Sequence, residues 1–303
     1  MSLSLTNVLF PVPHHHILAG FTSAPTLALP HVAQVALSDA ALGVHKAGRL
    51  PHAVVAPPAA DAAHPAAYEA AFARGSINPG NKTAPPGGFG FYVHGPAEWR
   101  RALEHHRVQQ EVVLSYEVRF EDGWEWQKGG KLPGVYGGVG EFAYGCSGGR
   151  QENRCKCFNL RLMWRQGGAG ELYAYLPLND TNAAALMAVP QTHRNPDYGF
   201  SVGRGLWKFE PGRWIAVAER VKMNTVGQAD GEVEVFIDGR SVLCAKGLIL
   251  RDADASESSV QGLHFQTFFG GHSEEWASPK DQKAWFTNIS GAILGTTPTH
   301  DEL

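Results

Sequence analysis

The chain has 303 residues, of which 44% are hydrophobic, and its formal net charge at pH 7 is −3. This length is enough for one large all-β domain or two ordinary domains, and the small negative charge provides no basic field for a nucleic acid. No stretch approaches the roughly 20 consecutive apolar residues that a membrane-spanning helix needs. We therefore expect neither nucleic acid nor membrane as a partner.

The first part of the chain, up to about residue 65, is rich in Ala, Pro and His and has little strict periodicity. We expect residues 1–30 to form a leader or a flexible segment, with His14, His15 and His16 in a flexible tail rather than a metal site. One or two irregular strands at the edge of the fold would follow. Residues 31–296 are predicted to form one β domain, and residues 297–303 a C-terminal tail.

After Tyr68, glycines, aromatic residues and alternating patterns dominate the sequence. The segment from Pro96 to Val108 is predicted to contain a short helix. Alternation predicts strands over 112–120, 157–165, 171–176, 213–223, 232–237, 240–244, 263–269 and 285–294, with Asp238-Gly239 as a hairpin turn. Many strands, few helices and no βαβ alternation predict an all-β fold, a two-sheet sandwich or jelly roll.

The predicted strands 157–165 and 171–176 separate apolar from polar side chains. Alternation puts one set in the core and gathers the polar set on the opposite face, namely Asn159, Arg161, Tyr173 and Tyr175. If the turn centres near Gly168, Arg161 lies opposite Tyr175 and Met163 opposite Tyr173. This polar face is typical of a ligand surface, although packed tyrosines and a solvated arginine would give the same pattern.

Two further segments carry candidate binding residues. Lys128 and Lys131 belong to the glycine-rich segment 127–138, where flexible backbone would let both lysines meet carboxylates, or where they would form a charged turn. This segment lacks the residue order of a phosphate-binding loop. His264 and Gln266 point to one side of a predicted strand, which fits binding of sugar hydroxyl groups or an ordinary solvated strand.

The cysteines and short motifs bear on cellular location. Three of the four cysteines, Cys146, Cys155, Cys157 and Cys244, fall close together, and this favours a local disulfide over a metal site because the nearest histidines are far away in sequence. Glycosylation triplets at Asn81, Asn179 and Asn288 and the HDEL motif at 300–303 predict the secretory pathway, with an extracellular protein expected first and one retained in the endoplasmic reticulum as the alternative. The N-terminus lacks a clean signal peptide.

Several segments resemble the family 14 polysaccharide lyases, which include alginate lyases and lyases acting on β-linked glucuronic acid, and in particular their fungal members and the related fungal glucuronan lyases. The likeness spans residues 112–294 in consistent order and weakens before residue 65. It is carried by KGGKLPGVYGG (128–138), CSGGR (146–150), CFNLRLMWR (157–165), GAGELYAYLPL (168–178), YGFSVGRG (198–205), GRWIAVAERVKMN (212–224), GEVEVFIDG (231–239), FQTFFGGH (265–272) and WASPKDQKAWF (276–286).

The resemblance implies a concanavalin-like β-jelly roll whose concave sheet forms a groove for a polymer. The lysine of the KLPG motif corresponds to Lys131, and the paired tyrosines correspond to Tyr173 and Tyr175. The strand motif S-x-R-x-M-W-R falls on Asn159 and Arg161, with Asn in place of the usual serine. The two motif cysteines correspond to Cys146 and Cys157 and imply a disulfide between them, which leaves Cys155 as an extra thiol.

The implied activity is β-elimination on a uronic-acid polymer, with glucuronan expected first and alginate second. Lys131 and Arg161 would neutralise the substrate carboxylate, and Tyr173 and Tyr175 would supply base and acid in an open order, with Lys131 as an alternative base. A tyrosine base requires a nearby cation that favours phenolate, a role that Arg161 beside Tyr175 would fill. The expected substrate-binding residues are Asn159, Lys128, Arg204, His264 and Gln266.

No redox cofactor or catalytic metal is expected, a structural calcium ion is left open, and the protein is expected to be a monomer. Two other classes of function remain as alternatives: a glycoside hydrolase on a similar sandwich and a non-catalytic carbohydrate-binding module or lectin. A hydrolase needs two carboxyl groups facing each other across the groove. Glu232 and Glu234 alternate on a strand but fit a solvated outer face better.

Overall fold

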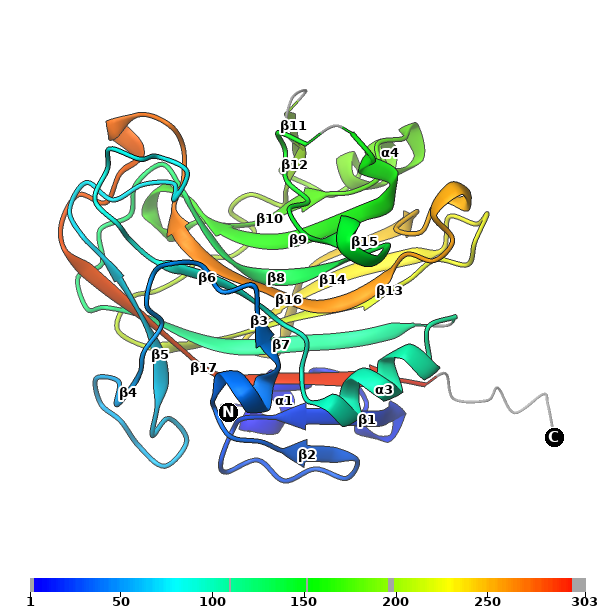
Figure 1. Ribbon diagram of the computed structural model, residues 1–303, viewed down its shortest axis with the longest axis horizontal. Helices are drawn as coiled ribbons and strands as arrows, with labels where there is room; N and C mark the ends of the chain where they lie inside the picture. The colour runs from blue at the N-terminus through cyan, green and yellow to red at the C-terminus, as the bar shows by residue number, and fades with distance from the viewer. Residues whose placement is uncertain (1–2, 109, 151, 196–198, 296–303) are drawn as a thin grey trace.

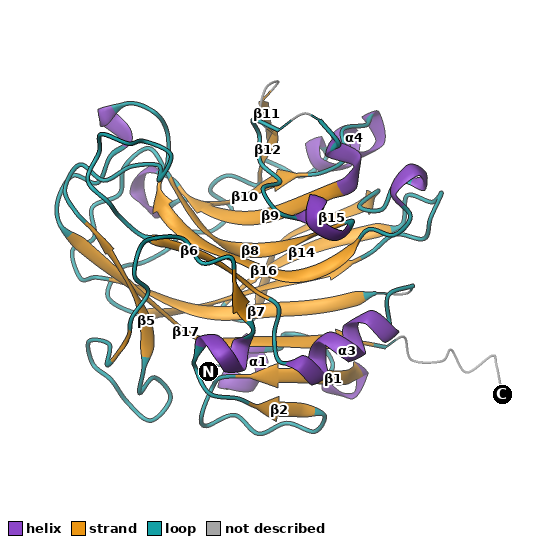
Figure 2. Cartoon of the chain, in the orientation of Figure 1, coloured by secondary structure: helices purple, strands orange, loops and turns teal. Residues whose placement is uncertain are grey.

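The computed structural model describes residues 3–108, 110–150, 152–195 and 199–295. Two sheets pack face to face (Figures 1 and 2). The first contains, in order across it, β15 (Arg240–Leu248), β14 (Gly231–Ile237), β13 (Trp214–Lys222), β7 (Glu111–Phe120), β17 (Gln282–Leu294), β1 (Ile17–Thr22) and β2 (Val32–Gln34). At its side, β5 (Ala67–Phe72) pairs with β17, and β4 (Val54–Val55) pairs with β5.

The second sheet lies above the first in Figure 1 and bends upward at both ends, so that its outer face is concave. In order, it contains β11 (His193–Asn195), β12 (Gly199–Val202), β10 (Gly170–Tyr175), β9 (Cys157–Trp164), β8 (Gly130–Gly138), β16 (Ser259–Phe269), β6 (Phe89–Val93) and β3 (Val44–His45). The prediction of an all-β two-sheet jelly roll is therefore confirmed.

Helices are short and lie at the ends and edges of the sandwich. The α-helices are α1 (Leu5–Leu9), α2 (Asp39–Leu42), α3 (Ala97–His105) and α4 (Asp180–Met187), and the 3-10 helices are η1 (His14–His16), η2 (Gly140–Ala143), η3 (Arg154–Lys156), η4 (Gln166–Gly168), η5 (Ala253–Ala255) and η6 (Glu274–Trp276). The helix predicted between Pro96 and Val108 is α3. Within the part of the chain that the structure describes, no helix is both long and apolar enough to span a membrane.

The strands predicted from alternation are all present, and the core confirms their apolar faces. Phe158, Leu160, Leu162 and Trp164 of β9 are fully buried between the two sheets. Asp238 and Gly239 both have positive φ, of 50° and 75°, as a two-residue turn between twisted antiparallel strands requires. The sandwich interior is therefore built from the side chains that the alternating patterns assign to it.

The prediction of a flexible segment over residues 1–30 is wrong for the described residues from Leu3 onward. Strand β1 pairs antiparallel with β17 and parallel with β2, and His14–His16 form η1 rather than a tail. Leu9, Phe10 and Ile17 are buried against the outer face of the first sheet. The elements here are too short for a period to appear, but their apolar side chains are buried all the same. The predicted tail 297–303, which contains the HDEL motif, lies outside the described residues.

The glycine-rich segment 127–138 is also not the flexible turn that we expected, because most of it is the central strand β8. A Cβ atom on Gly130 would lie 2.0 Å from the Trp164 ring, and one on Gly137 would lie 2.3 Å from Phe158. These glycines therefore make room for large core side chains of the neighbouring strand β9.

One glycosylation triplet is inaccessible. Asn288 is fully buried, and its side-chain Nδ2 donates to the Glu117 carboxylate over 2.6 Å. Asn179 serves as the N-cap of α4, where its side chain accepts a hydrogen bond from the backbone N–H of Asn182. Asn81 is exposed, so it is the triplet best placed to accept a glycan.

Candidate active site

The polar side chains predicted to share a face do share one, on the concave side of the second sheet. Tyr173 lies opposite Arg161, and Tyr175 lies opposite Asn159. The predicted register was wrong by two residues, because the turn centres on Gly167, which has a φ of 67° in η4, rather than on Gly168. An even shift leaves every side chain on its predicted face, so the error changed the partners and not the surface.

Lys131 lies at the centre of this face and is only 8% exposed. Its Nζ is 2.9 Å from the Met163 sulfur and 3.7 Å from the centre of the Tyr173 ring. Burial, together with the positive charge of Arg161, holds the pKa of Lys131 well below its usual range. Among the described residues, Lys131 forms no ion pair with a carboxylate. The structure thus brings together a buried amine and two aromatic rings without a fixed anion.

Arg161 and Asn159 are held by partners on β16. The Arg161 guanidinium donates to Gln266 Oε1, and Asn159 Nδ2 lies 2.9 Å from His264 Nδ1. Burial and the charges of Arg161 and Lys131 hold the pKa of His264 well below its usual range, so the imidazole is neutral and Nδ1 can accept from Asn159. Gln266 and His264, which the sequence predicts as binding residues, therefore lie beside the central cations.

The two tyrosines stand side by side, with ring centres 5.3 Å apart. Burial raises the pKa of Tyr173 to about 12. Burial also raises the pKa of Tyr175, although Arg161 and a hydrogen bond from the Gly148 backbone N–H act in the opposite direction. The expectation that Arg161 would favour phenolate is correct for its own contribution and wrong for the net shift, because desolvation of the ring is the larger effect.

Two predicted binding residues, Lys128 and Arg204, lie outside the cluster formed by Lys131, Arg161, Tyr173 and Tyr175. Lys128 forms an exposed ion pair with Glu275, with Nζ and Oε1 2.6 Å apart. Arg204 donates to the fully buried Glu171, which also pairs with Arg165 at 2.5 Å. Both cations are thus engaged with protein carboxylates on the flanks of the central cluster.

The structure adds residues that the sequence did not reveal. Tyr92 of β6 stacks on His264 with ring centres 4.3 Å apart, and the Tyr144 hydroxyl lies within 3.0 Å of both His45 and His94. These aromatic residues extend the polar face across β6 and β3. Strands β6 and β3 have five and two residues, and Tyr144 lies directly after η2 rather than on a strand, so no alternating pattern placed these residues on this face.

The implied disulfide is present between Cys146 and Cys157, while Cys155 and Cys244 are free. Both bonded cysteines pack against Tyr175. Arg154, in the loop that the disulfide closes, lies 5.1 Å from the centre of the Tyr175 ring. No group of three or more His, Cys, Asp and Glu side chains in the described ranges is arranged to hold a metal ion.

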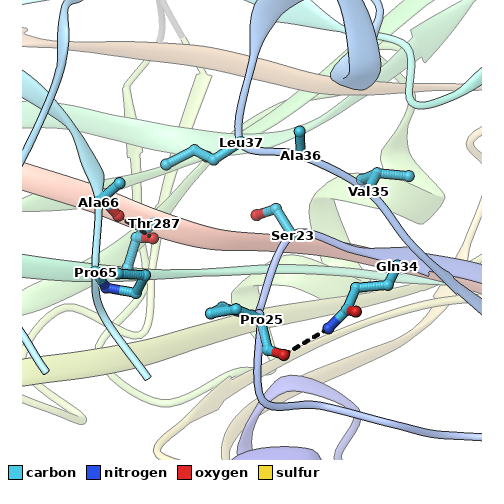
Figure 3. A pocket seen from close by; sticks show the side chains of 9 residues that line it. All are labelled: Ser23, Pro25, Gln34, Val35, Ala36, Leu37, Pro65, Ala66 and Thr287. Atoms are coloured by element: carbon cyan, nitrogen blue, oxygen red, sulfur yellow. Dashed lines mark hydrogen bonds between the residues drawn. The ribbon is translucent and has the colours of Figure 1, made fainter. Parts of the chain in front are cut away.

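A separate cavity of about 470 Å³ lies by β1 and the loops at residues 34–37 and 65–66 (Figure 3). It carries no titratable side chain. Gln34, at its rim, donates to the Pro25 carbonyl over 2.7 Å. Its lining consists of Ser23, Pro25, Gln34, Val35, Ala36, Leu37, Pro65, Ala66 and Thr287. Acid–base chemistry therefore points to the concave face and not to this cavity.

Comparison of the sequence with protein-family models finds a match to one family. The model of the family polysaccharide lyase 14 matches residues 60–289. A marine alginate lyase of this family from Aplysia kurodai is 31% identical and has a TM-score of 0.68, with 82% of this chain and 90% of that one covered. An alginate lyase from Chlorella virus is 21% identical with a TM-score of 0.60, covering 84% and 93%.

A glucuronan lyase from Trichoderma reesei is 12% identical with a TM-score of 0.49, covering 82% of this chain and 89% of that one, which is too distant to guide an argument. No curated protein sequence matches the chain. The family model spans well over half of the sequence, and the matched segment contains all four central residues, Lys131, Arg161, Tyr173 and Tyr175. The chain belongs to the polysaccharide lyase 14 family.

Proposed function

We propose that this protein cleaves a 1,4-linked uronate polymer by β-elimination and that alginate is its first substrate. One observation carries the proposal: Lys131, Arg161, Tyr173 and Tyr175 converge on one concave face. The 31% identity to an alginate lyase supports alginate. The order we expected from the sequence, glucuronan before alginate, is therefore reversed.

The reaction removes the proton at C5 of a uronate and expels the oxygen at C4. Negative charge builds up on the carboxylate as the C5–H bond breaks, so the site must neutralise it. Arg161, oriented by Gln266, is the cation for this purpose, and neutral His264 can donate from Nε2 because its Nδ1 faces Asn159.

Lys131 is the proposed base. Its lowered pKa leaves a neutral amine with a free lone pair at a pH where ordinary lysines are charged. The ammonium that forms after proton transfer would lie over the face of the Tyr173 ring, where cation–π attraction stabilises it.

Tyr175 is the proposed acid. Arg161 and the Gly148 N–H both hydrogen-bond its side chain, so the phenolate left after proton donation would be stabilised where it forms. The C5–H electron pair becomes the C4=C5 double bond, the C4–O4 bond breaks with its pair on oxygen, and that oxygen takes the Tyr175 proton. Return of the proton from Lys131 to Tyr175 resets the site.

The geometry also favours one of the two uronates of alginate, mannuronate, over the other, guluronate. Mannuronate carries H5 and O4 on the same side of the ring, whereas guluronate carries them on opposite sides. Lys131 and Tyr175 project from the same face of one sheet, with Nζ 5.6 Å from the Tyr175 ring centre, so both reach a sugar from one side. Polymannuronate should therefore be cleaved faster than polyguluronate.

A substrate panel tests the proposal. Polymannuronate, polyguluronate and glucuronan would be incubated with the protein, and far-ultraviolet absorbance of the unsaturated product followed. We expect absorbance to rise fastest with polymannuronate. Release of reducing ends without absorbance would instead identify a hydrolase, and tight polymer binding without turnover a binding module; either result contradicts the proposal.

The secretory pathway, a monomeric state and activity without a metal remain part of the proposal. The Cys146–Cys157 disulfide and the exposed Asn81 support an oxidising compartment. Expression in a eukaryotic secretory host should add a glycan at Asn81 that Asn81→Gln removes, and full activity should persist in a metal chelator. Loss of activity on chelation would instead indicate the structural calcium that the sequence left open.

A further inference from the structure

Lys131 reaches the concave face only because β8 contains a bulge. Leu132 and Val135 both point into the core, although they are three positions apart, and Lys131 and Tyr136 both lie on the opposite face. The pairing with β9 shifts between Lys131 and Gly134, which accommodates one extra residue in β8. A bulge of this kind re-aims the side chain beside it.

Side chains of the first sheet form hydrogen bonds, from the core side, with two backbone groups of the bulge. The Tyr116 hydroxyl of β7 donates to the Pro133 carbonyl over 3.1 Å. The Glu219 carboxyl of β13 accepts from the Val135 N–H over 2.7 Å. These contacts cross the sandwich interior, because Tyr116 and Glu219 are 1% and 2% exposed.

Burying the Glu219 carboxyl costs more free energy than a single hydrogen bond from a backbone N–H would recover. Its neighbours on the core side of β13 are Ile215, Val217 and Val221, and its second oxygen has no partner among the described residues. Burial raises its pKa well above the usual range, which keeps the carboxyl neutral. A buried polar atom without a partner is costly, so a role beyond packing is expected at such a position.

We infer that Tyr116 and Glu219 are positioning residues that fix the Leu132–Pro133 bulge from within the core and thereby hold the Lys131 amine at the reacting centre. Neither side chain reaches the concave face, so both act through the backbone of β8. The inference rests on the proposed function, because it assumes that Lys131 takes part in the elimination.

The test compares Tyr116→Phe, Glu219→Gln and Glu219→Leu with Val233→Ala. Val233 is a fully buried core residue on the neighbouring strand β14, so its truncation reports general core damage. Steady-state kinetics on polymannuronate would be measured at a temperature where circular dichroism shows each variant folded. Titration of Lys131 by NMR of Cε-labelled lysine, assigned with Lys131→Met, gives a readout that needs no activity.

We expect Tyr116→Phe and Glu219→Leu to lower kcat by about 10- to 100-fold with little change in KM, because a misplaced reacting group costs rate rather than binding. Glu219→Gln keeps an acceptor for the Val135 N–H and should keep most of kcat, as should Val233→Ala. The Lys131 titration should move in Tyr116→Phe and Glu219→Leu only.

The inference is overturned if Tyr116→Phe retains the kcat of Val233→Ala, or if Glu219→Gln falls as far as Glu219→Leu. Tyr116→Phe decides the matter if Glu219→Leu does not fold. If the unaltered protein cleaves no uronate polymer, the proposed function fails by itself, and an unchanged Lys131 titration in Tyr116→Phe would then separately overturn the positioning role.

Discussion

At the scale of single residues, the hydroxyl of Tyr175 is the group whose removal should be most informative. Tyr175→Phe leaves the ring packed against the disulfide but removes the proposed acid, so kcat should fall by about 10²- to 10⁴-fold with KM nearly unchanged. Tyr144→Phe is the matched control, since its hydroxyl contacts His45 and His94 rather than Arg161. Equal losses in both variants would argue against a specific role for Tyr175.

The protonation state of Lys131 gives a second prediction at this scale. Because its pKa is lowered, the neutral amine exists above that pKa and is lost as the pH falls through it. The ratio kcat/KM should therefore decline on the acid side as Lys131 gains a proton. Lys131→Arg places a permanent positive charge at this position and removes the base, so it should be inactive; an active Lys131→Arg would mean that charge neutralisation is the role of this residue.

At the scale of elements, the loop closed by Cys146 and Cys157 should support Tyr175. It carries both the Gly148 N–H and the Arg154 guanidinium that face this side chain. Replacing both cysteines by Ser should cost about 3 kcal/mol of stability, the value expected for a short closed loop, and should lower kcat because these two groups become mobile. Cys244→Ser, at an exposed free thiol, is the control and should change neither quantity.

The strands of the site also show how much of it the alternation of apolar and polar residues can predict. The faces of β9 and β10 follow directly from the two-residue period, which is why Asn159, Arg161, Tyr173 and Tyr175 were placed together before their register was known. Lys131 could be assigned to the site only by resemblance, because the bulge breaks the period of β8. Tyr116 and Glu219 gave no sign of a role, since their partners are backbone atoms of a distant strand.

At the scale of the whole molecule, Glu219 should make stability depend on pH. Its folded pKa lies above the value near 4.5 of an unfolded carboxyl, so folding takes up a proton between the two and stability falls as the pH rises. Glu219→Gln removes this dependence. Its Tm relative to the unaltered protein should therefore rise as the pH increases above 4.5; a constant difference would contradict the assignment.

Glu171 provides the opposite case in the same fold. Arg165 and Ser201 hold its pKa below the usual range despite burial, so it contributes stability above pH 4.5 that is lost on acidification. The Tm loss in Glu171→Gln should consequently be largest at neutral pH and shrink toward acid. Because Glu219 lowers stability and Glu171 raises it as the pH increases, the sign of the measured change of stability with pH shows which carboxyl group has the larger effect.

The overall architecture was predictable because most strands from residue 111 onward are long enough to show the two-residue period, although β8, with its bulge, was not recognised as a strand. The N-terminal part was not, since strands of two or three residues such as β2, β3 and β4 leave no period to detect. Strand β3 pairs with β6, whereas β2 and β4 pair with β1 and β5, which in turn pair with β17 far away in the sequence. Long-range pairing therefore determined what local patterns could not show.

The extra residue at Leu132–Pro133 makes the length of β8 as important as its composition. Loss of one residue there would leave Leu132 and Val135 two positions apart and Lys131 and Tyr136 four apart, so a regular strand would keep all four side chains on their present faces. Such a deletion would instead remove the irregular backbone whose Pro133 carbonyl accepts from Tyr116, and grafting the strand into another scaffold would have to carry its irregularity along to keep that contact.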